Sequence, residues 1–349
     1  MNSRLMIASM ILLGSQIHGH SQELIPAGKP VTMIIGTSAG GGTDSVGRLI
    51  AAHLARHPSF NRPILIQNIP GADGIVAMNY VASQAPIDGS LVVMSATPVG
   101  DPLNYRKPQA KYDPIDFRII GGIGRGGSTF LIRNDAESRL EDKRAEPVVI
   151  GGVAGVPRSG AQGLAWGIDI LGWNARWAVG YKGTNELFLA LQRGEIDMMA
   201  TGSARQIEEV RRGNTGIKIL SQTGLLSNGK VVARSEFADV PVFADVVEAH
   251  FGDDPRQKGG FTYWNTLMPL DKWLSLPPKT PEAITSYYRG LFLALASSPA
   301  FKEAGERLSE DFETQSYGDV EHLLIRLGKT SEETFDYIRL MLDRQKLTK

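Results

Sequence analysis

An apolar strand that leads through a glycine-rich loop into an amphipathic helix restricts the fold more than any other feature. Residues 31–35 are β-branched or apolar, residues 36–44 carry four glycines, and apolar residues recur at helical spacing over residues 46–54. The same arrangement returns at the loop 151–160, which precedes a helix expected over residues 161–171. Strands that alternate with helices in this way predict α/β units with parallel strands.

The alternation fills two stretches of the chain, which predicts two α/β lobes. In the first stretch, strands are expected at 63–68 and 91–95, with a helix at 75–84. The second stretch contributes further elements: strands at 130–133, 147–151, 177–181, 196–200 and 217–220, and helices at 185–193 and 206–212. The solvated, charged segment 135–146 is expected to link the first two of these strands.

The C-terminal part of the chain has a different pattern. Residues 261–268 form an apolar, aromatic run that predicts a strand, and four helices are expected after it, at 281–297, 299–309, 318–327 and 331–346. A helical tail after two α/β lobes indicates that the chain returns to the first lobe. We therefore expect residues 30–130 together with 261–349 to form lobe 1, and residues 131–260 to form lobe 2.

The N-terminus is typical of a secretory signal. Arg4 precedes a short apolar core at residues 5–13, and Gly19 and Ser21 place small residues before a cleavage site at Gln22. The apolar core is about half of the ~20 residues that span a bilayer. We therefore expect residues 1–21 to be a cleaved signal, with an uncleaved anchor or a buried strand as the alternative. A mature chain without another long apolar run would be soluble and exported, which suits a periplasm.

Composition excludes several classes of protein. The chain has 349 residues with 37 Lys and Arg against 37 Asp and Glu, and it has no cysteine. The missing cysteine rules out a disulfide scaffold, a thiol nucleophile and a cysteine-ligated metal site. The zero net charge argues against a nucleic-acid partner that would be held by a broad basic surface.

The loop at residues 36–44 has three chemical interpretations. A nucleotide-binding P-loop is rejected because Gly41 is followed by Gly42 rather than by lysine. The motif GxSxG at residues 36–40 would make Ser38 the nucleophile of an α/β hydrolase, with His250 or His322 as the base. The third interpretation is an anion cradle, in which backbone N–H groups and a helix N-terminus face a small carboxylate.

The second glycine-rich loop favours the anion cradle. Residues 151–160 occupy the equivalent place in the second lobe, so that two loops would face one cleft, and Arg158 would add a fixed positive charge. A plain tight turn with Asp44 as a helix cap would explain the first loop alone. A third glycine run, residues 121–127, is not followed by a helix and is expected to be a flexible approach to the crossover between the lobes.

Several motifs, in register over about residues 30–246, resemble the solute-binding receptors of tripartite tricarboxylate transporters, the Bug family. In the first lobe they are residues 39–44, 67–74, 86–89 and 112–114, and in the second lobe residues 181–183, 191–197 and 239–241. The resemblance implies an α/β, two-lobed fold of the periplasmic-binding-protein type (type II), with the ligand cleft between the lobes. It implies a binding protein rather than an enzyme, with no cofactor.

The resemblance also implies a ligand, a partner and a site. The ligand is a small carboxylate, which the receptor delivers to membrane permease subunits. By position, the site residues are Thr37, Ser38, Ala39, Gly40, Gly41, Thr43 and Asp44 in the first loop, Gly155, Val156, Arg158 and Ser159 in the second, and Ser95, Thr97, Thr201, Ser203 and Trp264 around the cleft.

The chain departs from the family pattern in its second loop, which carries Val156, Pro157 and Arg158 where small polar residues are usual. Trp166, Trp173 and Trp177 are also unusual, and core packing is the expected role of the last two. Ligand identity stays open, because Arg158 favours an anion and Trp264 with Tyr263 would suit an aromatic acid. A secreted serine hydrolase and a ligand sensor that signals to a membrane partner remain alternatives.

Overall fold

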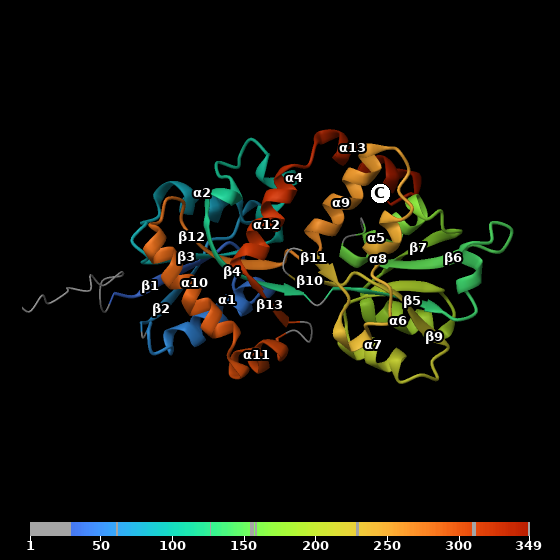
Figure 1. Cartoon of the computed structure of the whole chain (residues 1–349), viewed down its shortest axis with the longest axis horizontal. Helices are drawn as coiled ribbons and strands as arrows, with labels where there is room; N and C mark the ends of the chain where they lie inside the picture. The colour runs from blue at the N-terminus through green and yellow to red at the C-terminus, as the bar shows by residue number, and fades with distance from the viewer. Residues whose placement is uncertain are drawn as a thin grey trace, which may run out of the picture.

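The computed structural model describes residues 29–60, 62–125, 127–153, 157, 159–227, 230–308 and 312–347. The expected signal at residues 1–21 lies outside the described residues, as do Gly155, Val156 and Arg158 of the second loop. The described chain forms two α/β lobes that lie side by side along the long axis of the molecule (Figure 1). The α/β, two-lobed architecture predicted from the sequence is therefore confirmed.

The first lobe is built on a six-stranded sheet with the order β13-β4-β12-β3-β1-β2. Its strands are β1 (Val31–Ile35), β2 (Ile64–Asn68), β3 (Leu91–Ala96), β4 (Arg118–Arg125), β12 (Lys272–Leu276) and β13 (Phe312–Ser316). β1 pairs in parallel with β2 and β3, whereas β12 and β13 run antiparallel to their neighbours. Helices α1 (Gly42–Ala55), α10 (Glu282–Ala296) and α11 (Pro299–Glu306) cover one face, and α2 (Ile75–Gln84) and α12 (Tyr317–Gly328) cover the other.

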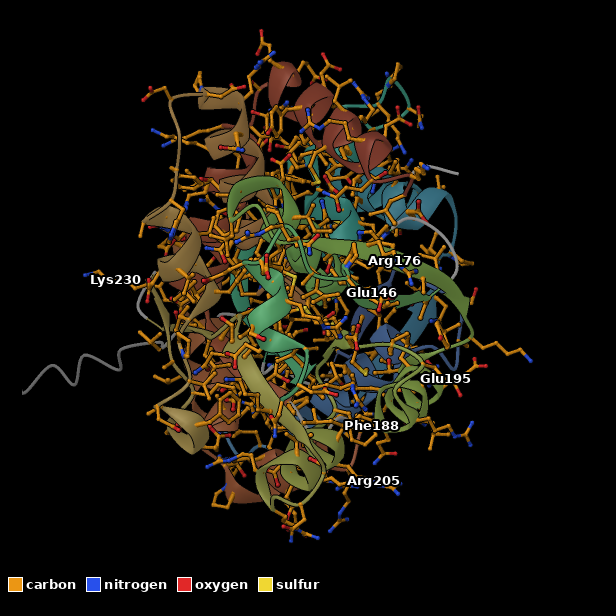
Figure 2. All side chains as sticks on the ribbon, turned by 90° about the vertical axis from the view of Figure 1, so that its right-hand side faces the viewer. Glu146, Arg176, Phe188, Glu195, Arg205 and Lys230 are labelled. Atoms are coloured by element: carbon orange, nitrogen blue, oxygen red, sulfur yellow. The ribbon has the colours of Figure 1, made fainter. Side chains whose placement is uncertain are left out.

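The second lobe is built on a five-stranded sheet with the order β7-β6-β8-β5-β9. Its strands are β5 (Thr129–Arg133), β6 (Val148–Val153), β7 (Ala175–Tyr181), β8 (Met198–Thr201) and β9 (Ile217–Gln222), and a hairpin of β10 (Leu225–Ser227) and β11 (Lys230–Val232) follows. Helices α6 (Thr184–Arg193) and α7 (Ala204–Arg211) pack on one face, and α5 (Ser159–Ile170) and α8 (Phe243–Glu248) on the other. Figure 2 turns the molecule so that the second lobe faces the viewer, with Phe188, Glu195 and Arg205 labelled. Phe188 is buried, whereas Glu195 and Arg205 are exposed.

Strand alternation sorts the side chains of β5 into two cores. Leu131 faces the core under α6 and α7, whereas Phe130 and Ile132 face a second cluster that also contains Ile34 and Val93 of the first sheet. This second cluster is therefore continuous between the lobes. Its centre is aromatic, with Phe243, Phe261, Trp264 and Trp166 in ring contact with one another, and Trp173 and Trp177 pack against it.

The strand expected at residues 261–268 is wrong, because these residues lie in helix α9 (Pro255–Leu267). Asp254 caps the helix by accepting a hydrogen bond from the Arg256 N–H, and Pro255 occupies the first turn, where its missing N–H costs nothing. Phe261 and Trp264, three residues apart, are both buried on one face. The strand was predicted because aromatic residues are typical of strands, although the spacing of Phe261 and Trp264 also fits a helix.

The glycine run at residues 121–127 is likewise no flexible approach over most of its length, because residues 118–125 form β4, between β12 and β13. The glycines are required by packing. A Cβ atom on Gly121 would lie 2.2 Å from Cδ1 of Phe292, and one on Gly122 would lie 2.6 Å from Cγ2 of Val320. Helices α10 and α12 thus approach the strand more closely than any side chain there would allow.

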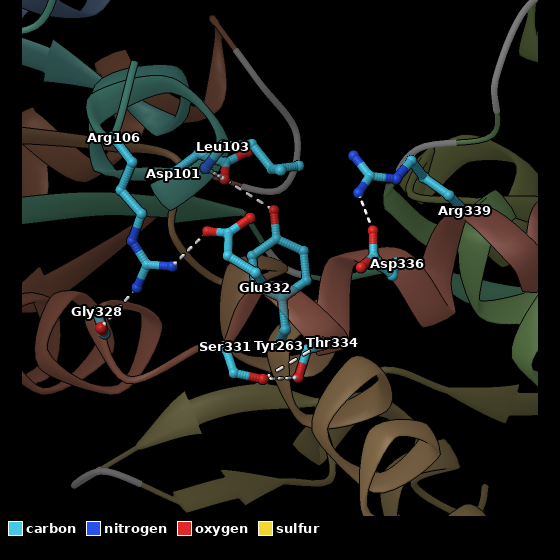
Figure 3. A network of polar contacts seen from close by, with 10 residues as sticks. All are labelled: Asp101, Leu103, Arg106, Tyr263, Gly328, Ser331, Glu332, Thr334, Asp336 and Arg339. Atoms are coloured by element: carbon cyan, nitrogen blue, oxygen red, sulfur yellow. Dashed lines mark hydrogen bonds and ion pairs between the residues drawn. The ribbon is translucent and has the colours of Figure 1, made fainter. Parts of the chain in front are cut away.

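The C-terminal helices touch both lobes. Helix α12 packs on β4, whereas α13 (Glu332–Arg344) packs on α9 and on α5 of the second lobe. Near the junction of these helices, Arg106 binds the Gly328 carbonyl and Glu332, and the Tyr263 hydroxyl donates to Asp101 (Figure 3). The tail therefore lies across the boundary between the lobes, and the exact lobe limits stay a prediction.

Candidate functional site

A pocket of about 250 Å³ opens where the carboxyl ends of β1, β2 and β3 meet at one edge of the first sheet. In open α/β sheets this edge is where ligands bind. Three loops and a floor line it: Gly36, Thr37, Ser38 and Thr43 from the first loop, Pro70, Gly71, Asp73 and Gly74 from the second, Ser95, Ala96, Pro98 and Val99 from the third, and Met78, Val93 and Met94 below.

The first loop delivers the chain to the N-terminus of α1 with its donors free for a ligand. Gly41 is the N-cap in an extended conformation and no side chain caps the helix, so the first internal bond runs from Ser45 N–H to the Gly41 carbonyl. The N–H groups of residues 42–44 therefore have no carbonyl within the helix to bind. Together with the helix dipole they favour an anion at this place.

Asp44 braces this loop rather than lining the pocket. The residue is 2% exposed, and its carboxylate accepts hydrogen bonds from Gly40 N–H at 2.8 Å, Asn68 Nδ2 at 2.9 Å and Arg48 Nε at 2.8 Å. The hydrogen bond from Arg48 lowers the pKa of Asp44 to about 2. Asn68 also donates to the Thr37 carbonyl at 2.9 Å, so that the acid and the amide fix both ends of the loop.

Thr37 offers a side-chain donor at the same place. Its Oγ1 is buried and has no hydrogen-bond partner among the described residues. Ser95, which is 3% exposed, has only the weak acceptor Sδ of Met78 at 3.5 Å. A buried hydroxyl without a strong partner is costly, and a ligand oxygen in the pocket would relieve that cost.

The loop between β2 and α2 forms the second wall of the pocket, which sequence reasoning did not assign to the site. A short 3-10 helix at Ala72–Gly74 follows Gly71, and all four residues have positive φ angles, of 138°, 46°, 55° and 94° from Gly71 to Gly74. Such a run is strained for the two residues that carry a Cβ atom. The sequence signal was the motif 67–74, which supports the family resemblance but was not assigned to the site.

The other predicted hydroxyl residues have structural partners. Thr97 Oγ1 donates to the Leu270 carbonyl at 2.6 Å, which ties the start of α3 (Thr97–Gly100) to the segment that follows α9. Thr201 Oγ1 bonds Gln206 at 2.7 Å and accepts from Ser203 N–H at 3.0 Å, and Ser203 caps α7. None of these three residues lines the pocket.

The remaining predicted residues lie near the pocket edge or in the core. Ala39, Gly40 and Gly41 are exposed in the first loop, and Ser159 begins α5 at the matching edge of the second sheet. Trp264 is 2% exposed inside the aromatic cluster and is not part of the pocket wall. The structure therefore brings Thr37, Ser38, Thr43 and Ser95 together in one pocket and places the rest around it.

Neither a serine hydrolase nor a metal centre finds support in the described residues. No described histidine hydrogen bonds to Ser38, and Nδ1 of His250 lies 2.8 Å from the carbonyl oxygen of Val246 instead. The described part of the chain also contains no group of three metal-ligating side chains. Among the described helices, none is long and apolar enough to cross a membrane.

Comparison with known proteins connects this geometry to a family, although no family model matches the chain. A UPF0065 protein of Bordetella pertussis is 24% identical over 310 residues, which is 85% of each chain. A UPF0065 protein of Cupriavidus necator is 32% identical over 117 residues, covering 32% of this chain and 33% of that protein.

A solved TctC solute-binding protein from Polaromonas, with no ligand, is 19% identical and has a TM-score of 0.64 over 90% of this chain and 98% of its own. A protein of Rhodopseudomonas palustris solved with adipate is 18% identical, with a TM-score of 0.53 over 90% of this chain and 97% of its own. In sequence and in fold this chain resembles the Bug family, the solute-binding receptors of tripartite tricarboxylate transporters, as its motifs predict.

Proposed function

We propose that this chain is a periplasmic solute-binding protein that captures a small organic acid between two lobes and delivers it to a tripartite tricarboxylate-type membrane permease. The observation that carries the proposal is the pocket at the carboxyl edge of the first sheet, which is lined by Thr37 and Thr43. The Thr37 hydroxyl has no hydrogen-bond partner among the described residues, and the N–H of Thr43, in the first turn of α1, has no carbonyl within the helix to bind. A carboxylate accepts several such hydrogen bonds at once, and charge makes each of them stronger.

The ligand would be captured between the two lobes, with residues 30–130 and 261–349 assigned to lobe 1 and residues 131–260 to lobe 2. In this proposal Ser159, at the start of α5, and Arg158, which the family resemblance assigns to the site, are the contribution of lobe 2 to binding of the carboxylate. Closure excludes water and strengthens each of these contacts. It is favoured only to the extent that the ligand binds the closed state more tightly than the open one.

The pocket suits a ligand of modest size. Cavities of about 150 Å³ hold a benzene ring, and this pocket of about 250 Å³ has room for a chain or ring of similar scale with one carboxylate. The neighbour solved with adipate supports the same chemical class. Transport rather than hydrolysis is the proposed outcome because no described histidine hydrogen bonds to Ser38.

A thermal-shift screen of the chain from Gln22 onward tests the proposal. Mono-, di- and aromatic carboxylates are compared, and a ligand at 100 times its Kd adds about 2.7 kcal/mol to the free energy of unfolding. Thr37→Val should weaken the best ligand about fivefold to tenfold, since one hydrogen bond contributes about 1 kcal/mol. The matched control, Thr262→Val on the exposed side of α9, should leave affinity unchanged.

Two results would contradict the proposal. If no carboxylate raises the melting temperature, the chain is not a receptor for this class of solute. If the wild-type chain hydrolyses esters and Ser38→Ala abolishes the turnover, the first loop is a nucleophile elbow instead.

A further inference from the structure

The charges at the pocket are unbalanced in a way that the binding of a simple dicarboxylate does not explain. Asp73 is the only ionisable residue among the described residues that line the pocket. It is exposed at the rim, and in the described part of the chain its carboxylate has no hydrogen bond or ion pair. A free negative charge therefore lies beside a site that is proposed to take an anion.

Two described cations close to the pocket lining already have carboxylate partners. Arg48, close to the first loop, is paired with Asp44. Lys272 lies directly opposite Ala96, which lines the pocket, but its ammonium group is paired with Asp271. Neither cation is left to neutralise Asp73 or to bind a second carboxylate of a ligand.

The backbone holds Asp73 at the rim at a cost in strain. Its φ and ψ angles are 55° and 32°, and the preceding Ala72 has a φ of 46°. A left-handed conformation costs a residue with a Cβ atom roughly 1–2 kcal/mol. Hydrogen bonds from Gly74 and Val76 to the Gly71 carbonyl hold this turn, and Gly74 packs against Gly36. The carboxylate is thus presented by a turn with little freedom to move it away.

Most of the pocket lining outside the first loop and Asp73 is apolar. The floor residues Met78, Val93 and Met94 are all at most 2% exposed, and Pro70, Pro98 and Val99 also lie among the lining residues. Such a surface fits hydrocarbon, and outside the first loop Ser95 is the one described lining residue that carries a hydroxyl. The pocket therefore has three zones, which are a donor-rich loop, an apolar floor and a negative rim.

We propose that Asp73 selects a zwitterionic acid, whose carboxylate binds the first loop, whose hydrocarbon spacer covers the floor and whose ammonium group pairs with Asp73. The inference rests on the proposed function and adds a substrate class to it. A dicarboxylate of equal length would place its second charge beside Asp73, where like charges repel. A monocarboxylate with a plain hydrocarbon end would bind with intermediate affinity.

Isothermal titration with length-matched acids at constant ionic strength tests this. One set is 4-aminobutyrate, butyrate and succinate, and another is 6-aminohexanoate, hexanoate and adipate. At the preferred length, the amino acid should bind wild-type protein at least about tenfold more tightly than the dicarboxylate, a difference of about 1.4 kcal/mol. Asp73→Asn should reduce that ratio to within about threefold.

Asparagine is chosen because it tolerates the left-handed backbone at this position, so the loop should keep its conformation. The control is Asp116→Asn, an exposed aspartate outside the pocket, which should leave the ratio of affinities unchanged. The inference is overturned if the dicarboxylate binds wild type as tightly as the amino acid, or if Asp73→Asn leaves the ratio unchanged. If no acid of any class binds, the proposed function itself fails.

Discussion

Asp169 fastens the C-terminal helix to the second lobe, and Asp169→Asn tests how strongly. Its carboxylate, at the end of α5, accepts hydrogen bonds from the Tyr337 hydroxyl at 2.6 Å, Arg344 at 2.6 Å and Gln257 Nε2 at 3.1 Å. The side chain is 8% exposed, so these three donors replace water almost completely. An amide at this position keeps the shape but loses the charge and faces a donor group toward one of its partners.

The magnitude follows from this geometry. A hydrogen bond to a charged group contributes about 1.5–3 kcal/mol, and breaking a fully buried ion pair costs about 3–5 kcal/mol. The side chain of Arg344 is 56% exposed, so solvent recovers part of the loss. We therefore expect Asp169→Asn to lower the free energy of unfolding by about 2–3 kcal/mol.

Urea unfolding followed by tryptophan fluorescence measures this value, because Trp166 stacks on Tyr337 beside the substituted residue. The matched control is Asp336→Asn on α13, where an exposed pair with Arg339 predicts a change within about 0.5 kcal/mol (Figure 3). Equal changes in the two variants would refute the reasoning that α13 is held to α5 by a buried carboxylate.

Three further predictions concern the loop, the sheet and the predicted cleft hydroxyls. Asp44→Asn should lower the free energy of unfolding at neutral pH by about 1–2 kcal/mol. Because folding lowers the pKa of Asp44 from 3.8 to about 2, the difference in stability between wild type and variant should shrink as the pH falls from 3.8 to about 2, as measured by urea titration. Gly121→Ala should destabilise the fold by about 1–3 kcal/mol through its clash with Phe292, whereas Gly290→Ala, in open space on α10, should raise stability by about 0.4–1 kcal/mol in thermal melts. Thr201→Val should lower the melting temperature and leave ligand affinity unchanged in calorimetry, because its hydroxyl serves Gln206 and the α7 cap.

Elements with a clear period could be predicted from the sequence, and those defined by long-range packing could not. The strand at 31–35 and the helix at 75–84 match β1 and α2 in both limits, because apolar period and turn residues agree there. Strand β13 (Phe312–Ser316) was missed because its sequence, FETQS, is largely polar and it lies at the sheet edge. Strand β4 was missed because its glycines, which leave space for the Phe292 ring, are typical of a loop when only the sequence is considered.

The part of the site that has a local sequence pattern could be predicted, and the part that depends on long-range packing could not. The first loop could be found because a glycine-rich turn between a strand and a helix carries a local signal, and Thr37 and Ser38 do line the pocket. Asp73 carried no such signal, because only its left-handed backbone and its place beside the first loop reveal it. Hydroxyl residues such as Thr201 look alike in sequence whether they bind a ligand or cap a helix.

The central claim is that a carboxylate binds at the first loop, and a crystal structure of the mature chain with its tightest carboxylate tests it most directly. We expect carboxylate oxygens within hydrogen-bond distance of Thr37 Oγ1 and of the amides of residues 42–44, in a cleft closed by the second lobe. A ligand bound elsewhere, or one whose carboxylate faces solvent while its other end fills the first loop, would contradict it.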